Sequence, residues 1–174
     1  MPKGNDPPPH PLPPRIVIES TPPVMQNPRR LARIAALQGL YQLDLQREGE
    51  PLSLDDAMVL PGEEVELTSE MRDYARELVR ETWAAREKYD GMITEVSKHW
   101  DVARMVVVDR NILRLAINEL LERLDTPPRV IIDEAIEIGR DYGTKETPQF
   151  VNGVLDAIYK KHPSVRVARG EDQK

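Results

Sequence analysis

The stretch DRNILRLAINELLERL, residues 109–124, decides the fold class. Its apolar residues recur at steps of three and four, which is the spacing of one face of an α-helix. They form a wide apolar stripe made of Ile112, Leu113, Ala116, Ile117, Leu120, Leu121 and Leu124. A stripe of this width is typical of a central helix that other helices surround. We expect Asp109 to be the N-cap of this helix.

Further helical patterns flank the central segment. The first begins at Pro28, with Asn27 as N-cap and the proline in the first helical position. The next begins after Thr68 and is expected to reach about residue 99, with a break at residues 90–91. Two more follow the central segment, RVIIDEAIEIGRDYG at 129–143 and QFVNGVLDAIYKKH at 149–162. The sequence therefore predicts an all-α fold.

Prolines divide the chain into a lead and a folded body. Of the 16 prolines, ten lie at or before Pro28. Each proline lacks a backbone donor and disfavours helix in the residue before it. We therefore expect residues 1–27 to be a Pro-rich disordered tail and residues 28–163 to form one helical domain. Residues 164–174, SVRVARGEDQK, are expected to be a disordered C-terminal tail.

The composition excludes several classes of protein. Cysteine is absent, which rules out a disulfide framework, a cysteine nucleophile and a thiolate metal site. No apolar run approaches the ~18 residues of a membrane span, and the first residues lack the apolar segment of a secretory signal. We expect a cytoplasmic protein with no membrane contact. The net charge of −6 argues against indiscriminate coating of nucleic acid but is compatible with a local basic site.

The motifs of common enzymes are missing. There is neither a phosphate-binding glycine loop nor a GxSxG elbow, and the three histidines are far apart in the sequence. Glu134 and Glu137 share a helix face and could serve as an acid–base pair, although a solvated or partner-facing helix side is favoured. His99 and Trp100 could form a stacking site, but a packed tryptophan beside an exposed histidine is favoured. We expect no catalytic residue, no cofactor and no metal ion.

Three arginines gather at the amino end of the first helix, namely Arg29, Arg30 and Arg33. Cations in this position oppose the helix macrodipole, so they lower the stability of the helix and invite a functional explanation. Arginine pairs bidentately with phosphate groups and stacks on bases. The turn is therefore a candidate RNA-binding edge, with solvated surface arginines as the alternative.

The segment GTKETPQFVNG, residues 143–153, provides a second candidate surface. Lys145 and Gln149 have the chemistry to contact phosphates or base edges. Phe150 is the only phenylalanine of the chain and is either a stacking platform or a core residue. Gly153 costs a helix ~1 kcal/mol relative to alanine. This cost suggests the close approach of another backbone, either inside the fold or from a partner.

Three blocks of sequence are specific in combination. They are RRLARIAALQGLYQLD from residue 29, HWDVARMVVVDRNILRLAINEL from residue 99 and RVIIDEAIEIGRDYGTKETPQFVNGVLDAI from residue 129. On these blocks the chain resembles the bacterial transcription antitermination factor NusB family over most of residues 28–161. The resemblance implies two small packed helical bundles and no catalytic activity.

The resemblance also implies partners. NusB-like proteins bind the boxA element of ribosomal RNA operon transcripts together with NusE, a small-subunit ribosomal protein. The complex joins NusA, NusG and RNA polymerase, and it suppresses termination within the operon. Some members of the family form homodimers that hide the RNA surface.

Site residues follow from the positions that match the family motifs. The resemblance assigns RNA binding to Arg29, Arg30, Arg33, Lys145, Gln149 and Phe150. It assigns partner binding to Asp109 and Glu146. The alternative is a protein-only helical adaptor, for instance a dimer, that does not bind RNA.

Overall fold

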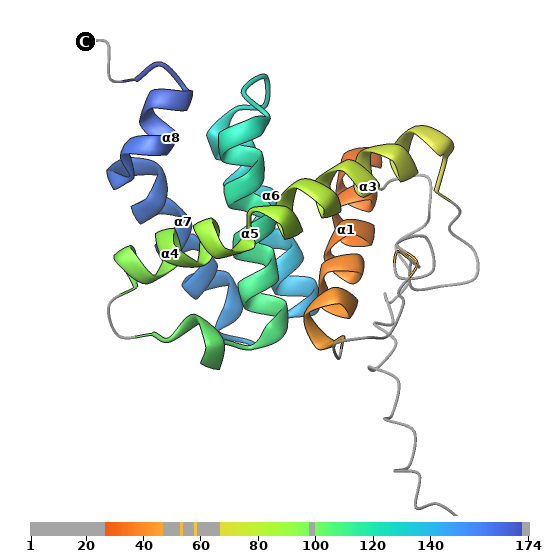
Figure 1. Cartoon of the computed structure of the whole chain (residues 1–174), viewed down its shortest axis with the longest axis horizontal. Coiled ribbons are helices and arrows are strands. Elements are labelled where there is room, and N and C mark those ends of the chain that lie inside the picture. The colour runs from red at the N-terminus through yellow and green to blue at the C-terminus, as the bar shows by residue number, and fades with distance from the viewer. Residues whose placement is uncertain (1–26, 47–52, 54–57, 59–66, 98–99, 172–174) are drawn as a thin grey trace, which may run out of the picture.

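The protein is built from helices. A computed structural model describes residues 27–46, 53, 58, 67–97 and 100–171. Its elements, drawn in Figure 1, are α1 (Pro28–Leu45), α3 (Ser69–Ala84), α4 (Arg86–Val96), the short 3₁₀ helix η2 (Val102–Arg104), α5 (Val107–Glu122), α6 (Pro128–Tyr142), α7 (Thr147–Lys161) and α8 (Pro163–Ala168). No strand occurs within the described ranges, so the predicted all-α fold is confirmed. None of the described helices has the length and apolar character required to cross a membrane.

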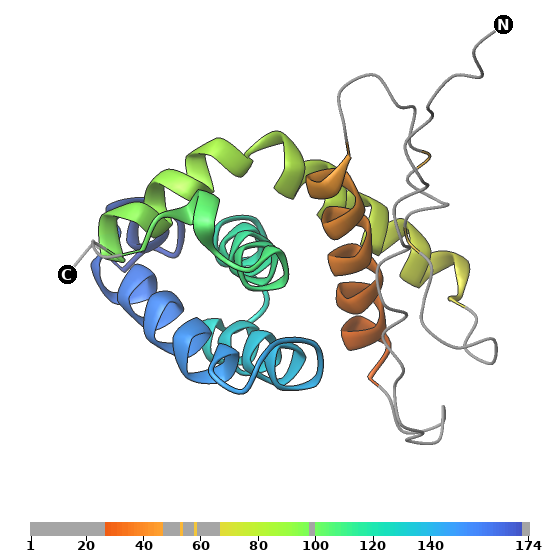
Figure 2. The same cartoon turned by 90° about the horizontal axis from the view of Figure 1, so that it is seen from below.

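Helix α5 is the centre of the fold, as its apolar stripe predicts. Figure 2 shows α5 nearly end-on, with α1 on one side and α6 and α7 on the other. Helices α3 and α4 pass over it, α3 against α1 and α4 towards α7. Every residue of α5 from Asn111 to Leu121 is buried. Two packed groups of helices therefore share this single central helix.

Arg114 joins α5 to both groups. Its guanidinium donates two hydrogen bonds of 2.7 Å to the carboxylate of Asp90 on α4 and one of 3.1 Å to Asp44 on α1. Asn111 donates to the same oxygen of Asp44 at 2.8 Å. Since the side chain of Arg114 is only 7% exposed, these bonds replace those that water would otherwise make. The central helix is thus fixed by polar contacts as well as by apolar packing.

The long helix predicted from Thr68 is interrupted, but not at the predicted residues. Helix α3 ends at Ala84 and α4 begins at Arg86, whereas residues 90–91 lie inside α4. At the junction, the Arg86 guanidinium donates to the carbonyl of Trp83 at 2.8 Å and lies 4.3 Å from the centroid of its ring. This side chain stabilises a bend that contains neither glycine nor proline.

The domain begins as predicted but ends differently. Helix α1 begins as predicted, because Asn27 Oδ1 accepts a hydrogen bond of 2.9 Å from the N–H of Arg29. Residues 1–26 of the predicted N-terminal tail lie outside the described residues. The predicted C-terminal tail is wrong for its first residues, which form α8 and bury Val165 completely. Proline at position 163 does not end the fold but begins this last helix.

Candidate functional site

Arg29 lies exposed at the amino end of α1. Its guanidinium lies 5.1 Å from the ring centroid of Tyr74 on α3, a cation–π distance. A groove of about 470 Å³ opens between the starts of α1 and α3, and both residues line it. Arg29 has no carboxylate partner in the described part of the chain. Its charge is therefore available to an anionic ligand.

Arg30 is less free than its neighbour. Its Nε and Nη2 atoms each donate a hydrogen bond of 2.8 Å to the carboxylate of Glu134 on α6. The hydrogen bonds from Arg30 lower the pKa of Glu134, against the opposing effect of burial. A carboxyl group with a lowered pKa does not hold a proton at neutral pH, so Glu134 is unsuited to act as a general acid. The acid–base interpretation of Glu134 and Glu137 therefore has no support in this geometry.

The lowered pKa of Glu134 predicts a pH-dependent contribution to stability. Because the pKa is lower in the folded state, the ionised carboxylate stabilises the fold above about pH 4.3, and this stabilisation is lost as the pH falls through the folded-state value. We expect Glu134→Gln to be less stable than the wild type at pH 7, with a difference that shrinks below about pH 4. Urea unfolding between these pH values measures it. Glu137→Gln, which alters a surface ion pair of the same helix, is the control. A difference that stays constant with pH would contradict the assignment.

Arg33 does not lie on an exposed edge. Its side chain is 3% exposed, and its Nε atom donates to both carboxylate oxygens of Glu119 on α5, at 3.0 and 2.9 Å. Burial disfavours the charge of Arg33, but the hydrogen bonds to Glu119 and the charge of Glu119 outweigh this effect and raise the pKa of Arg33. Tyr74 Oη also donates to Glu119, at 3.1 Å. The expectation of an accessible Arg33 is therefore wrong, because this arginine is paired inside the fold.

The second predicted group surrounds the start of α7. Lys145 and Glu146 lie exposed in the turn before the helix, and Gln149 is exposed in its first turn. Phe150 is half-buried against the core, and its ring centroid lies 5.7 Å from that of Trp100 at an interplanar angle of 60°. Trp100 is 61% exposed, so the expectation of a packed tryptophan is wrong. The residue predicted to be exposed beside it, at position 99, lies outside the described residues.

Asp109 supports this turn from inside. It lies in the first turn of α5 rather than at its N-cap, which is Val106, and is 8% exposed. Its Oδ1 atom accepts a hydrogen bond of 2.7 Å from Thr147 Oγ1, and the same hydroxyl accepts one of 2.9 Å from the N–H of Thr144. Burial raises the pKa of Asp109, and the bond from Thr147 partly counteracts this effect. Asp109 therefore faces the fold, which corrects its predicted place on a partner surface.

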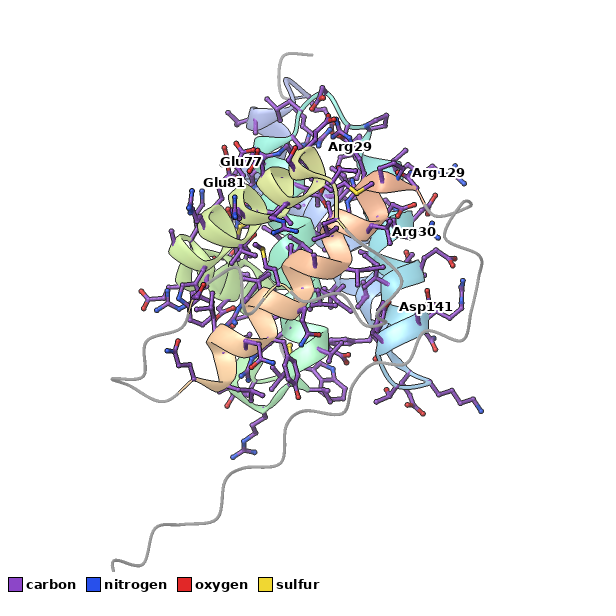
Figure 3. All side chains as sticks on the ribbon, turned by 90° about the vertical axis from the view of Figure 1, so that its right-hand side faces the viewer. Arg29, Arg30, Glu77, Glu81, Arg129 and Asp141 are labelled. Atoms are coloured by element: carbon purple, nitrogen blue, oxygen red, sulfur yellow. The ribbon has the colours of Figure 1, made fainter. Side chains whose placement is uncertain are left out.

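The predicted RNA-binding residues lie in two separate places. Figure 3 shows Arg29, Arg30 and Arg129 near one end of α6 and Asp141 near the other end, just before the turn that carries Lys145. We call the first group the arginine corner. Helix α6, with 15 residues at roughly 1.5 Å rise each, is about 22 Å long; Arg129 lies in its first turn, whereas Arg30 is paired with Glu134 nearer its middle. Asp141 lies in the last turn of α6, close to the second place.

Two surface residues were not assigned to the site from the sequence, although Trp100 was considered as a stacking residue. Arg129 has a side chain that is 92% exposed, with a long ion-pair contact of 3.7 Å to Asp133, and it adds a third cation to the arginine corner. No pattern around it distinguishes it from other helix-start residues. Trp100 joins the predicted Phe150 at the other end. Its position in a short irregular segment gave no periodicity from which exposure could be predicted.

Comparison with known proteins gives a consistent result. The model of the NusB family matches residues 30–160. The transcription antitermination protein NusB of Anaeromyxobacter dehalogenans is 45% identical over 148 residues, which cover 84% of this chain and 99% of that protein. The NusB protein of Desulfitobacterium hafniense is 43% identical over 130 residues, covering 75% of this chain and 86% of that protein.

Solved structures show the same similarity in three dimensions. NusB of T. maritima superposes with a TM-score of 0.67 at 38% identity, over 79% of this chain and 94% of that one. A chain from a crystal structure of the antitermination factors NusB and NusE in complex with dsRNA superposes with a TM-score of 0.63 at 30% identity. This superposition covers 78% of this chain and 98% of the chain from that complex.

Proposed function

Because the chain belongs to the NusB family, we propose that it is a transcription antitermination factor that binds boxA RNA of ribosomal RNA operon transcripts together with NusE. The observation that carries the proposal is the arginine corner, where Arg29 is exposed and lacks a carboxylate partner among the described residues. A free arginine at the surface of a protein with a net charge of −6 is a specific anion site rather than part of a general basic coat.

Two separated contacts would hold the RNA. Arg29 supplies a salt-dependent phosphate contact at the arginine corner, with Arg30 and Arg129 beside it. Lys145 and Gln149 supply a second contact at the start of α7, where Phe150 offers an aromatic surface for bases. Arg33 takes no direct part, because its pairing with Glu119 fixes α1 against α5 and so positions Arg29 and Arg30.

The protein partner is assigned to the turn and helix that follow α6. Glu146 is exposed there, and Gly153 on α7 has no atom of the described structure within 4 Å of the place where a Cβ would lie. The close approach that Gly153 permits is therefore not used inside the described fold, and we assign it to a partner. A partner that shares the RNA adds contacts and effective concentration, which compensates for weak binding by an acidic protein alone.

The wider assignments follow the family. We propose that the protein acts in the cytoplasm, without catalysis, in an antitermination complex that contains NusA, NusG and RNA polymerase. The competing proposal is a protein-only adaptor, or a homodimer with its arginine surface covered. It predicts no RNA binding even when NusE is present, and sedimentation at several concentrations, with and without RNA, separates the two proposals.

The proposal predicts the effect of removing Arg29 and Lys145, two site cations without a carboxylate partner among the described residues. We expect Arg29→Ala combined with Lys145→Ala to weaken binding of labelled boxA RNA about tenfold at low salt, because two phosphate contacts are lost. The slope of log affinity against log salt should become shallower by about 1.4, or about 0.7 per contact on a single strand. Fluorescence anisotropy across a salt series, with and without NusE, measures both quantities.

The matched control is Lys88→Ala, which removes an exposed cation on α4, away from α1 and α6. This variant should bind RNA as the wild type does and show the same salt dependence. Equal affinities and slopes for the double variant and the wild type would contradict the site. No binding by any of the proteins, with NusE present, would contradict the proposed function itself.

A further inference from the structure

An exposed tryptophan distinguishes the end of the molecule opposite the arginine corner. Among the described residues, Trp100 is the only aromatic side chain in the set of large apolar side chains that are exposed, and 61% of its surface is accessible. Tryptophan has a large apolar surface whose exposure to water is unfavourable. Nothing in the described fold requires Trp100 at the surface, so its ring is available to a ligand.

The surrounding residues hold Trp100 in one orientation. Its backbone N–H donates to the carbonyl of Ser97 at 2.8 Å, which ties it to the end of α4. On its other side, Asp101 caps η2 by accepting a hydrogen bond of 3.0 Å from the N–H of Ala103. The ring itself meets Phe150 in an edge arrangement, and Phe150 is anchored in the core. A large ring that is already ordered loses little entropy when a ligand stacks on it.

Two exposed cations, Lys145 and Arg104, lie near this pair in the sequence, together with the exposed carboxylates of Asp101 and Glu146. Lys145 is exposed, and no carboxylate pairs with it in the described ranges. Arg104, four residues after Trp100, has a side chain that is 89% exposed and makes only a long contact of 3.9 Å with Asp101. Aromatic rings bordered by accessible cations are the arrangement that binds single-stranded nucleic acid, since bases stack on the rings while the cations attract the backbone.

We propose that Trp100, supported by Phe150, is a stacking platform for one unpaired base of the RNA. The proposal rests on the proposed function and extends it, because it names Trp100 as a base-binding residue and places it beside Phe150 in the first turn of α7. Stacking accepts every base, so the platform adds affinity and fixes the position of the strand rather than selecting a sequence.

The first test compares affinity with salt dependence. We expect Trp100→Ala to weaken binding of labelled boxA RNA about tenfold while leaving the salt slope unchanged, because a stacked base contributes no counterion release. Phe150→Leu, which keeps an apolar side chain in the core but removes the ring, should weaken binding in the same direction. Leu124→Ala, which shortens another exposed apolar side chain at the far end of α5, is the matched control and should bind as the wild type does. A reduced slope for Trp100→Ala would overturn the proposal.

The second test identifies the base. In the Trp83→Phe background Trp100 is the only tryptophan, so stacking should quench its fluorescence when RNA is added. RNAs carrying one abasic nucleotide at successive positions should show one position at which both the quenching and about tenfold of affinity are lost. In the Trp100→Ala variant, the abasic nucleotide at that position should cause no further loss of affinity, because the base and the ring form a single interaction.

The outcomes distinguish a failure of the stacking platform from a failure of the proposed function. If RNA binds and Arg29 matters, but neither quenching nor the abasic effect occurs, the platform is overturned and the proposed function stands. If Trp100→Ala weakens binding of NusE in the absence of RNA and leaves RNA binding unchanged, the surface binds protein and the proposal is wrong. If no RNA binds at all, the proposed function fails first.

Discussion

Replacing Arg33 by alanine is expected to lower the free energy of unfolding by about 3–5 kcal/mol, the range for leaving a buried charge without its partner. The substitution leaves Glu119 without its charged partner. Glu119 is 2% exposed and accepts both hydrogen bonds of Arg33. The hydroxyl of Tyr74 would remain as a donor to Glu119, but a neutral hydroxyl does not compensate a buried carboxylate. Urea denaturation followed by circular dichroism measures the change.

Two further variants make the result for Arg33 interpretable. Arg129→Ala removes a surface arginine and should change stability by no more than about 0.5 kcal/mol. The double variant Arg33→Met with Glu119→Leu removes both charges and should recover most of the loss, because no uncompensated charge stays buried. If Arg33→Ala were as stable as the wild type, the pair would not be buried in solution. If the double variant were as unstable as the single one, the loss would come from packing instead.

Ending the chain after His162 is expected to destabilise the domain by about 3 kcal/mol. Truncation removes Val165, whose full burial is worth about 1.5 kcal/mol or more. It also removes Arg169, whose guanidinium donates to the carbonyls of Leu120 at 2.9 Å and Thr126 at 3.0 Å. Charge-assisted hydrogen bonds of this kind contribute about 1.5–3 kcal/mol, and they satisfy carbonyls at and beyond the C-terminal end of α5. Thermal and urea unfolding of the two chains measures the difference.

The controls for the truncation isolate its cause. A chain that ends after residue 171 keeps α8 and Arg169 and should be as stable as the full chain. Arg169→Met in the full chain should reproduce part of the loss, since it keeps the apolar stem and removes only the donors. A truncated chain with unchanged stability would contradict a structural role for α8 and would favour the prediction that residues 164–174 are a tail.

The parts of the fold that sequence could predict are those that follow from periodicity. The stripe from Ile112 to Leu121 predicts a buried central helix whatever surrounds it, and Asn27 followed by Pro28 predicts the start of α1 from local chemistry alone. The segment after Pro163 has too few apolar residues to establish a period. Val165 is the one side chain of that short helix that is buried. A helix of this length is stabilised by contacts with the rest of the fold. These contacts cannot be predicted from the local sequence.

The candidate site could be predicted only in part for a related reason. The arginines at positions 29, 30 and 33 cannot be distinguished by residue type, but their side chains lie in different surroundings. Arg33 shares its helix face with Leu37 and Leu40, both buried, and this spacing was the available signal for its burial. Its partner Glu119 lies 86 residues away in the sequence, so the pairing itself depends on the packing of α1 against α5. The exposure of Trp100 likewise depends on where the end of α4 lies.

Helix α6 is a spacer of fixed length between Arg129, in its first turn, and the turn that carries Lys145, after its end. A helix held on both faces by α5 and α7 neither stretches nor bends easily, so the distance between the two contacts is set by the number of its residues. If RNA binds as proposed, this spacing sets the shortest strand that reaches both places. We expect an RNA shorter than this span to engage one contact at a time, and a longer strand to engage both and to gain the second contact at high effective concentration. Selection by length in this way would require no reading of bases.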